Sequence, residues 1–194
     1  MIYVSFGSVL KASQMSDELR IIFTTVFAKL PQRILWKWET DEMEGKPENV
    51  MLSKWLPQQD ILAHPNLKIF ISHMGQSSSQ EALCHRKPVV MIKQLWFFKM
   101  SINYLKHFHF QIGIPVLGDQ PGNSLEAEKK GYGINIPIFE LTEEKLSTAI
   151  KKILANDSFA KRAKEHGTLV MDQITQPIDR AVWWIEYAMR HKGR

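Results

Sequence analysis

The sequence predicts an α/β protein built on a Rossmann-like, doubly wound parallel sheet. Short apolar runs alternate with segments of roughly 8–15 residues whose apolar positions follow the helical period. Glycine, proline and serine punctuate the ends of these runs. Such alternation is typical of a parallel sheet with helices on both faces, and ligands bind these sheets at the carboxyl ends of their strands.

The first half of the chain supplies most of the predicted strands. A buried strand over residues 2–6 ends at Gly7 and Ser8. Ser16 then caps a helix that runs to about Leu30 and has one apolar face. The remaining elements of this half are strands over 33–38, 50–53 and 67–71 and a short helix over 58–63.

The second half continues the alternation and ends in helices. The predicted elements are a strand over 88–92, a helix over 124–130 closed by Gly131, a strand over 133–137, a helix from the Thr142 cap to about residue 155, a helix capped by Asp157, and a last helix that opens at Pro177. The last helix is expected to pack as core or against a partner domain. Its apolar positions are Val182, Trp183, Ile185, Tyr187, Ala188 and Met189.

Polar residues gather directly after the strand over 67–71. Gly75 is expected to give the backbone a sharp turn, and Ser77 and Ser78 are expected to open a helix. The free N–H groups and positive dipole of such a helix start favour phosphate. Glu81, about one turn further on, is placed to accept hydrogen bonds from ribose hydroxyls.

Two further side chains extend this candidate site, although each part also has an ordinary explanation. Trp55, held by the proline two residues later, offers a flat face on which a base can stack. A tryptophan before proline is nevertheless more often core than platform, and a lone histidine such as His73 is more often structural. A Gly–Ser turn is also ordinary helix capping.

The ordered set of these residues carries more information than any one of them. The set comprises Trp55, Pro57, Gln58, Asp60, Leu62, His64, Pro65, Phe70, Ser72, His73, Gly75, Ser78, Glu81, Pro88, Asp119 and Gln120. It resembles the signature of UDP-glycosyltransferases, most closely the animal UDP-glucuronosyl and UDP-glucosyltransferase type. The resemblance implies that residues 1–194 form the donor-binding, C-terminal half of a GT-B fold, with the N-terminal acceptor domain absent.

The resemblance also implies a role for each site residue. Trp55 would stack on uracil and Gln58 would contact the uridine. The implied UDP-sugar-binding residues are Ser8, Trp55, Gln58, His73, Gly75, Ser77, Ser78, Glu81, Asp119 and Gln120. Of these, Ser8, His73, Gly75 and Ser78 would face the diphosphate, Glu81 the ribose, and Asp119 with Gln120 the sugar. Lys37 is either a basic residue near the nucleotide or a solvated lysine.

The implied reaction is inverting transfer of glucose or glucuronate from a UDP-sugar to a small lipophilic acceptor. No cofactor or metal is expected, because a helix dipole and backbone N–H groups can stabilise the leaving diphosphate. No catalytic residue is expected in this chain either, since the family's general base belongs to the N-terminal domain. The chain alone is therefore expected to be inactive; the alternative is a catalytically silent UDP-sugar-binding or regulatory fragment that associates with family members.

Composition bears on the number of domains, the presence of disulfides and the kind of partner. An apolar share of 44% over 194 residues suits one globular domain, and the single cysteine excludes an internal disulfide. The net charge of +5 comes without a basic stripe interleaved with aromatics outside residues 93–112, so nucleic acid is not an expected partner. The family resides in the endoplasmic-reticulum membrane, but no signal peptide or spanning run is visible, which leaves the location open.

Two departures from the family pattern stand out. Residues 93–112 form an atypical insert that is aromatic and basic without one acidic residue. An added amphipathic helix, a membrane-surface patch and translated non-coding sequence all fit this composition; we favour the last, and expect the insert to be foreign to the fold. Near the site, Met74 and Ser77 replace other residues of the family, and Arg86 stands where glycine is usual, which would strain a positive φ.

Overall fold

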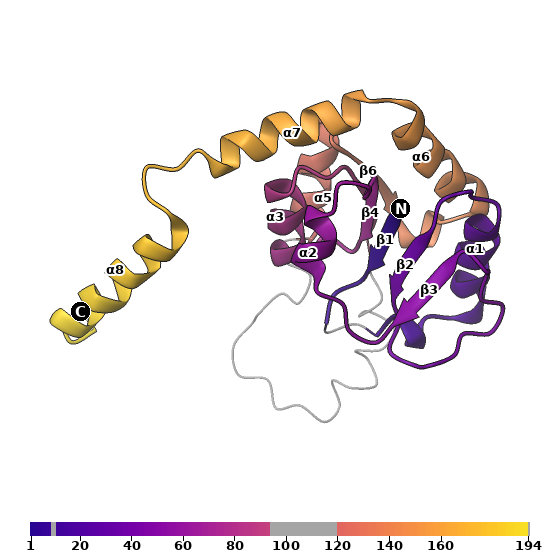
Figure 1. Cartoon of the computed structure of the whole chain (residues 1–194), viewed down its shortest axis with the longest axis horizontal. Coiled ribbons are helices and arrows are strands. Elements are labelled where there is room, and N and C mark those ends of the chain that lie inside the picture. The colour runs from indigo at the N-terminus through magenta and orange to yellow at the C-terminus, as the bar shows by residue number, and fades with distance from the viewer. Residues whose placement is uncertain (9–10, 94–119, 194) are drawn as a thin grey trace.

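A computed structural model of the chain describes residues 1–8, 11–93 and 120–193. A parallel sheet of six strands lies at its centre, in the order β3-β2-β1-β4-β5-β6 (Figure 1). The strands are β1 (Ile2–Ser5), β2 (Ile34–Lys37), β3 (Val50–Ser53), β4 (Ile69–Ser72), β5 (Val89–Lys93) and β6 (Gly133–Pro137). The order reverses between β1 and β4, the position where a doubly wound sheet opens a ligand crevice.

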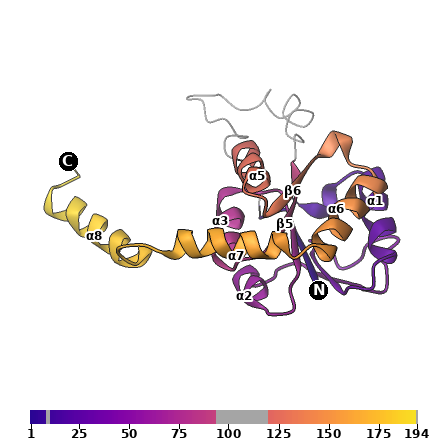
Figure 2. The ribbon, with the colours of Figure 1, turned by 90° about the horizontal axis from the view of Figure 1, so that it is seen from above.

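Helices cover both faces of the sheet (Figures 1 and 2). On one face lie α1 (Asp17–Ala28) and α6 (Glu143–Ala155), which contact each other. The other face carries α2 (Gln58–Ala63), α3 (Gln76–Cys84) and α5 (Gln120–Lys129), with α7 (Ser158–Met171) packed on α3. Short 3-10 turns occur at Ala12–Gln14 and Ile138–Glu140. The predicted α/β class is confirmed.

Strand periodicity divides the core into two apolar clusters. On β1, Ile2 and Val4 face the cluster under α1 and α6, whereas Tyr3 between them faces the cluster under α2 and α3. The first cluster centres on Trp36, whose ring lies 5.3 Å from the ring of Phe23. The second contains the rings of Tyr3 and its β4 neighbour Phe70, 5.0 Å apart and nearly parallel. Alternate residues of one short strand therefore anchor both layers.

The helix caps mostly follow the sequence prediction. The Ser16 hydroxyl accepts a hydrogen bond from the Leu19 N–H, and Thr142 accepts one from the Lys145 N–H. Asp157, predicted as the cap of α7, makes no capping bond through its side chain. Asn156 does this instead, since its Oδ1 accepts from the Ser158 N–H at 2.9 Å.

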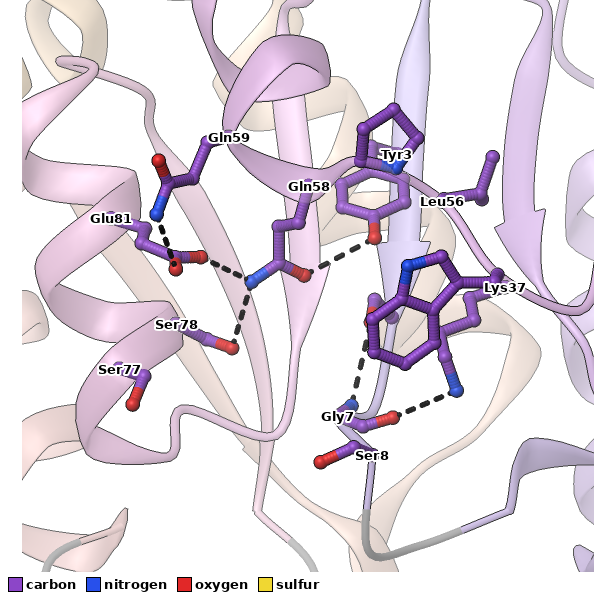
Figure 3. Close-up of a pocket in the computed structure, with 13 residues that line it drawn as sticks. Tyr3, Gly7, Ser8, Lys37, Leu56, Gln58, Gln59, Ser77, Ser78 and Glu81 are labelled. Atoms are coloured by element: carbon purple, nitrogen blue, oxygen red, sulfur yellow. Dashed lines mark hydrogen bonds between the residues drawn. The ribbon is translucent and has the colours of Figure 1, made fainter.

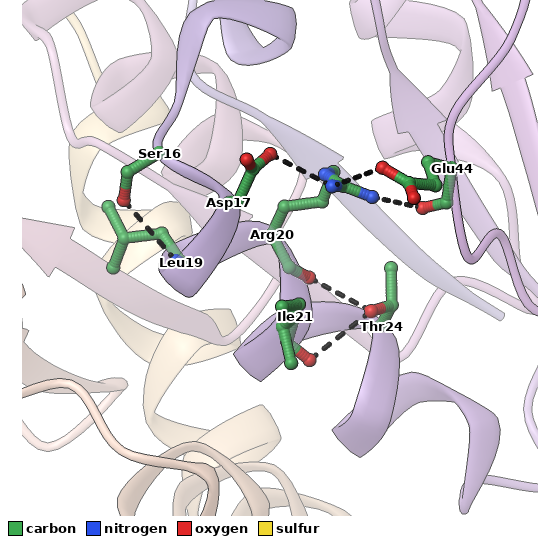
Figure 4. Close-up of polar contacts among 7 residues, drawn as sticks. All are labelled: Ser16, Asp17, Leu19, Arg20, Ile21, Thr24 and Glu44. Carbon is green, nitrogen blue, oxygen red and sulfur yellow. Dashed lines mark hydrogen bonds and ion pairs between the residues drawn. The ribbon is translucent and has the colours of Figure 1, made fainter.

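Arg20 ties the polar loop after β2 to the first turn of α1. Its Nη2 lies 2.8 Å from Asp17 Oδ1 and 2.9 Å from Glu44 Oε2, and its Nη1 donates to the Glu44 carbonyl (Figure 4). The contact joins residues far apart in sequence, so it helps to hold the loop between β2 and β3 against the helix.

The C-terminal helix differs most from its prediction. No residue of α8 (Pro177–Arg190) is buried, and Trp183, Ile185 and Met189 are exposed. The helix extends away from the sheet and its covering helices (Figures 1 and 2). The expectation that its apolar residues form core is therefore wrong for this domain, because α7 already completes the covering layer on that side.

Two other predictions concern the segment between β5 and β6. The atypical insert over 93–112 lies outside the described residues except for Lys93, which ends β5. The helix predicted over 124–130 starts earlier, at Gln120, and ends at Lys129, two residues before Gly131, whose φ of +74° suits the predicted role in closing the helix. Among the helices in the described ranges, none is long and apolar enough to cross a membrane.

Candidate functional site

A pocket of about 330 Å³ opens at the carboxyl ends of β1 and β2, beside α2 and the first turn of α3 (Figure 3). Six of the predicted site residues line it: Ser8, Trp55, Gln58, Ser77, Ser78 and Glu81. They come from three separate segments of the chain, so the sheet topology brings them together. The pocket lies at the crevice where the strand order reverses, as the doubly wound fold predicts.

Side-chain amides hold the Glu81 carboxylate from both sides. The Nε2 of Gln58 donates to Glu81 Oε2 at 2.6 Å, and the Nε2 of Gln59 donates to Glu81 Oε1 at 3.3 Å (Figure 3). Gln58 Nε2 also lies 3.1 Å from the Ser78 hydroxyl. Each carboxylate oxygen keeps further lone pairs for hydroxyl donors of a ligand. Glu81 is thus a fixed acceptor at one end of the pocket.

Tyr3 forms part of the pocket floor below Gln58. Its hydroxyl donates to Gln58 Oε1 at 3.1 Å, while its ring is fully buried. Burial raises the pKa of the Tyr3 phenol, hydrogen bonding with Ser5 opposes that shift, and the negative charge of Glu81 adds to it. The phenol therefore stays protonated, as a donor, throughout the neutral range.

Lys37 is buried at the opposite side of the pocket, which excludes the solvated alternative. Its Nζ donates to the Gly7 carbonyl at 3.1 Å and forms an ion pair with Glu39 at 3.0 Å. Glu39 also accepts from the Ser13 N–H at 3.0 Å. The Lys37–Glu39 ion pair thus contacts Gly7 at one end and Ser13 at the other. It fixes Gly7 and Ser8 at the pocket rim.

The indole of Trp55 is open to a stacking partner. Trp55 is 73% exposed although it lines the pocket, so it is no part of the core. Lys37 Nζ lies 5.8 Å from the centre of its ring, within the range of a cation–π contact. A flat, accessible ring beside a buried cation suits a planar base better than it suits an aliphatic ligand.

The turn after β4 is made differently from its prediction. Gly75 has an ordinary φ of −60°, whereas Met74 adopts the positive φ, +59°. Glycine is needed at 75 for space, because a Cβ there would lie 2.9 Å from His73 Nε2. A Cβ at Gly7 would likewise lie 2.7 Å from His73 Cε1. The His73 ring therefore occupies the gap between two glycines, behind the residues that line the pocket.

The first turn of α3 has the features of an anion site. Gly75 is its N-cap and supplies no side-chain cap, so no side-chain oxygen of the N-cap satisfies the N–H groups of the first turn. Ser77 and Ser78 add hydroxyls there. Helix dipole, N–H groups and hydroxyls together suit phosphate. The helix begins at Gln76, one residue before the predicted serine start.

Other predicted features are placed only in part. Asp119 lies outside the described residues, and Gln120 is described only as the start of α5. Arg86 adopts a φ of +58°, as its replacement of a family glycine predicted, at a cost of about 1 kcal/mol. Within the described ranges, no group of three or more His, Cys, Asp or Glu side chains is arranged to hold a metal.

Sequence reasoning missed Tyr3, Ser5 and Gln59 as pocket residues, and it named Gly7 only as part of the turn that carries Ser8. Tyr3 has a detectable signal, since a hydroxyl-bearing ring stands between two aliphatic residues in the first strand. Gln59 has none, because a second glutamine at a helix start is typical of solvent exposure. Only the packing of α2 against α3 brings it to Glu81.

Comparisons with known proteins agree with this geometry. The family model described as UDP-glucuronosyl and UDP-glucosyl transferase matches residues 1–109 and 110–194, and the junction of the two matches falls within the segment 93–112. UDP-glycosyltransferase UGT5 of Dactylopius coccus is 36% identical over 193 residues, and mouse UDP-glucuronosyltransferase 2A3 is 32% identical. Both alignments cover 100% of this chain and 32% of the relative, so the chain spans about a third of their length.

Solved structures show the same fold at low sequence identity. The spinosyn forosaminyltransferase SpnP aligns with a TM-score of 0.71 at 14% identity, over 95% of this chain and 43% of that one. Os79 from O. sativa, solved with U2F and trichothecene, aligns with a TM-score of 0.69 at 19% identity, over 97% and 41%. The domain has the Rossmann-like architecture of the C-terminal half of GT-B glycosyltransferases. The family model and the Dactylopius coccus and mouse relatives match this chain over its whole length. The chain therefore belongs to the UDP-glucuronosyl and UDP-glucosyl transferase family.

Proposed function

We propose that this chain binds a UDP-sugar as the donor half of a hexosyltransferase. The observation that carries the proposal is the pairing of Glu81, held by two amides, with the accessible Trp55 indole in one pocket. In the proposed complex uracil stacks on Trp55 and the ribose hydroxyls donate to Glu81. The diphosphate lies between Ser8 and the first turn of α3, and Asp119 and Gln120 are the residues proposed to bind the sugar.

The proposed chemistry is inverting transfer of glucose or glucuronate to a small lipophilic acceptor. Negative charge grows on the leaving diphosphate, and the dipole and N–H groups of α3 stabilise it without a bound metal. The acceptor and its general base belong to a second domain in this proposal. The residues of this chain that the proposal uses bind the donor.

We expect the purified chain to prefer UDP over ADP by at least about tenfold, or ~1.4 kcal/mol. Family membership implies a uridine donor, and the accessible Trp55 indole is the surface on which uracil is proposed to stack. Isothermal calorimetry with each nucleotide measures the difference. Equal affinity for the two, or no heat with either, contradicts the proposal.

A tryptophan pair supplies the control for this measurement. Trp55→Ala should lower UDP affinity by about tenfold, because stacking on an aromatic ring is worth roughly 1–3 kcal/mol per base. Trp184→Ala removes another exposed indole, from α8 and outside the pocket, and should leave UDP binding unchanged.

We expect no measurable glycosyl transfer by this chain alone. The reason is the proposed division of labour, in which donor binding and acceptor activation lie on different domains. Incubation with UDP-glucose or UDP-glucuronate and a phenolic acceptor, followed by chromatography of the products, tests it. Product formation that disappears in His73→Ala would contradict the expectation. UDP binding without transfer would also be the behaviour of a silent, regulatory fragment, the alternative to an enzyme half.

A further inference from the structure

Tyr3 belongs to the core through its ring and reaches the pocket through its hydroxyl. Its ring is fully buried on β1 and stacks on Phe70 of the adjacent β4, with centroids 5.0 Å apart and planes 9° apart. The ring cannot shift without disturbing two central strands. Its hydroxyl nevertheless reaches out of the sheet to a different element, where it donates to Oε1 of Gln58 on α2 at 3.1 Å.

The Gln58 amide has a defined orientation because its two ends meet different partners. Nε2 contacts the Glu81 carboxylate at 2.6 Å and the Ser78 hydroxyl at 3.1 Å. A carboxylate can only accept, so the reversed amide would place two acceptors against each other. The observed orientation directs Oε1 toward the pocket floor, where it needs a donor. The Tyr3 hydroxyl is that donor (Figure 3).

We propose that Tyr3 is a positioning residue for recognition of the ribose diol, acting through Gln58 on Glu81. The inference rests on the proposed function, in which the 2′ and 3′ hydroxyls of UDP donate to Glu81. Without the phenolic hydroxyl, Gln58 Oε1 loses its donor and faces an apolar ring edge in a part-buried position. The amide then turns toward water in the pocket, Nε2 leaves Glu81, and the carboxylate loses its fixed direction.

The effect is confined to the ribose end of the ligand. Trp55 is held by its own segment, and Ser8 lies on the turn that Lys37 fixes through the Gly7 carbonyl. The Tyr3 hydroxyl also hydrogen-bonds with Ser5, whose Oγ accepts from the Gly7 N–H at 3.4 Å, but the Lys37 contact holds that turn without it. A merely structural tyrosine would instead weaken every part of the pocket equally.

Tyr3→Phe tests the proposal, because it keeps the ring and its stacking and removes only the hydroxyl. Calorimetry on the full chain compares UDP with 2′,3′-dideoxyuridine diphosphate, which lacks the diol. We expect Tyr3→Phe to weaken UDP binding about fivefold, and the binding of the dideoxy analogue to change by less than about twofold. Tyr132→Phe is the matched control: Tyr132 is also buried but lies outside the pocket, so both affinities should stay unchanged.

A second measurement needs no ligand. The side-chain amide protons of Gln58, followed by NMR in the free protein, should shift in Tyr3→Phe and stay in place in Tyr132→Phe. Equal losses for both nucleotides, no loss for UDP, or unshifted amide protons each overturn the role of Tyr3. If the wild-type chain binds neither nucleotide, the proposed function itself fails. Wild-type UDP binding with an unchanged ratio in Tyr3→Phe overturns this inference alone.

Discussion

Glu81→Gln is expected to lower the UDP affinity of the chain by about 30-fold, or ~2 kcal/mol. The substitution keeps the shape of the side chain and an oxygen for Gln58 Nε2, but it removes the charge that strengthens hydrogen bonds from the ribose hydroxyls. It also replaces one carboxylate oxygen with an NH₂ group. The amide of Gln59, which donates to Glu81 Oε1, then faces another donor. Calorimetry with UDP measures the loss.

The control removes the same charge elsewhere. Glu165→Gln alters an exposed residue of α7 that does not line the pocket, and UDP affinity should stay within about twofold of wild type. The dideoxy analogue should lose little affinity in Glu81→Gln, since it has no diol to donate. An equal loss for UDP and the analogue would show that Glu81 shapes the pocket as a whole and would contradict its assignment to the ribose.

The elements of this fold were predictable where a local signal was strong. The strands Val50–Ser53 and Gly133–Pro137 and the helix Gln58–Ala63 match their predicted ranges, because apolar runs and proline boundaries mark both ends. Caps with a single candidate hydroxyl, such as Ser16, were equally clear. The cap of α7 was not, since Asn156 and Asp157 adjoin and only backbone geometry selects between them.

The exposure of α8 illustrates a second limit. Its apolar spacing is that of a helix with a buried face, and the sequence carries no information about which element would cover that face. Periodicity predicts that a stripe exists and not what it contacts. The position of α8 beyond a sheet already covered by α3 and α7 follows from tertiary packing alone.

The site was predictable as a set of residues and less so as a geometry. Six predicted residues meet in one pocket because parallel strands end at one edge of the sheet. The turn after β4 was assigned to the wrong residue, since a Met-Gly pair suggests that glycine takes the positive φ. In the structure Met74 adopts the positive φ. Gly75 is needed for a different reason, because a Cβ there would meet the His73 ring.

The contact between α3 and α7 depends on one glycine. Gly167 lies in the middle of α7 against the last turn of α3, and a Cβ built there would lie 2.2 Å from the Leu83 carbonyl oxygen and 2.9 Å from Arg86 Cγ. The arginine side chain can move aside. The carbonyl is part of the backbone of α3 and cannot, so any side chain at 167 must separate the two helices.

Gly167→Ala is therefore expected to destabilise the domain by about 2 kcal/mol. Separation of packed helices costs roughly 3 kcal/mol, and the better helix propensity of alanine returns up to about 1 kcal/mol. Urea unfolding followed by circular dichroism measures the change. Gly122→Ala is the matched control, because Gly122 is also helical and meets no atom within 4 Å of its Cβ position, so stability should be unchanged or slightly raised.

Gly167→Ala is expected to change stability and leave UDP binding nearly unchanged. We expect α7 to move and α3 to stay, since α3 is joined directly to β4 and β5 by short turns, whereas α7 leads only to the segment before the exposed α8. Glu81 and Ser78 on α3 should then keep their places, and folded Gly167→Ala should bind UDP within about threefold of wild type. A larger loss of affinity would show that α3 yields to the added methyl group, and that α7 sets the position of the pocket wall.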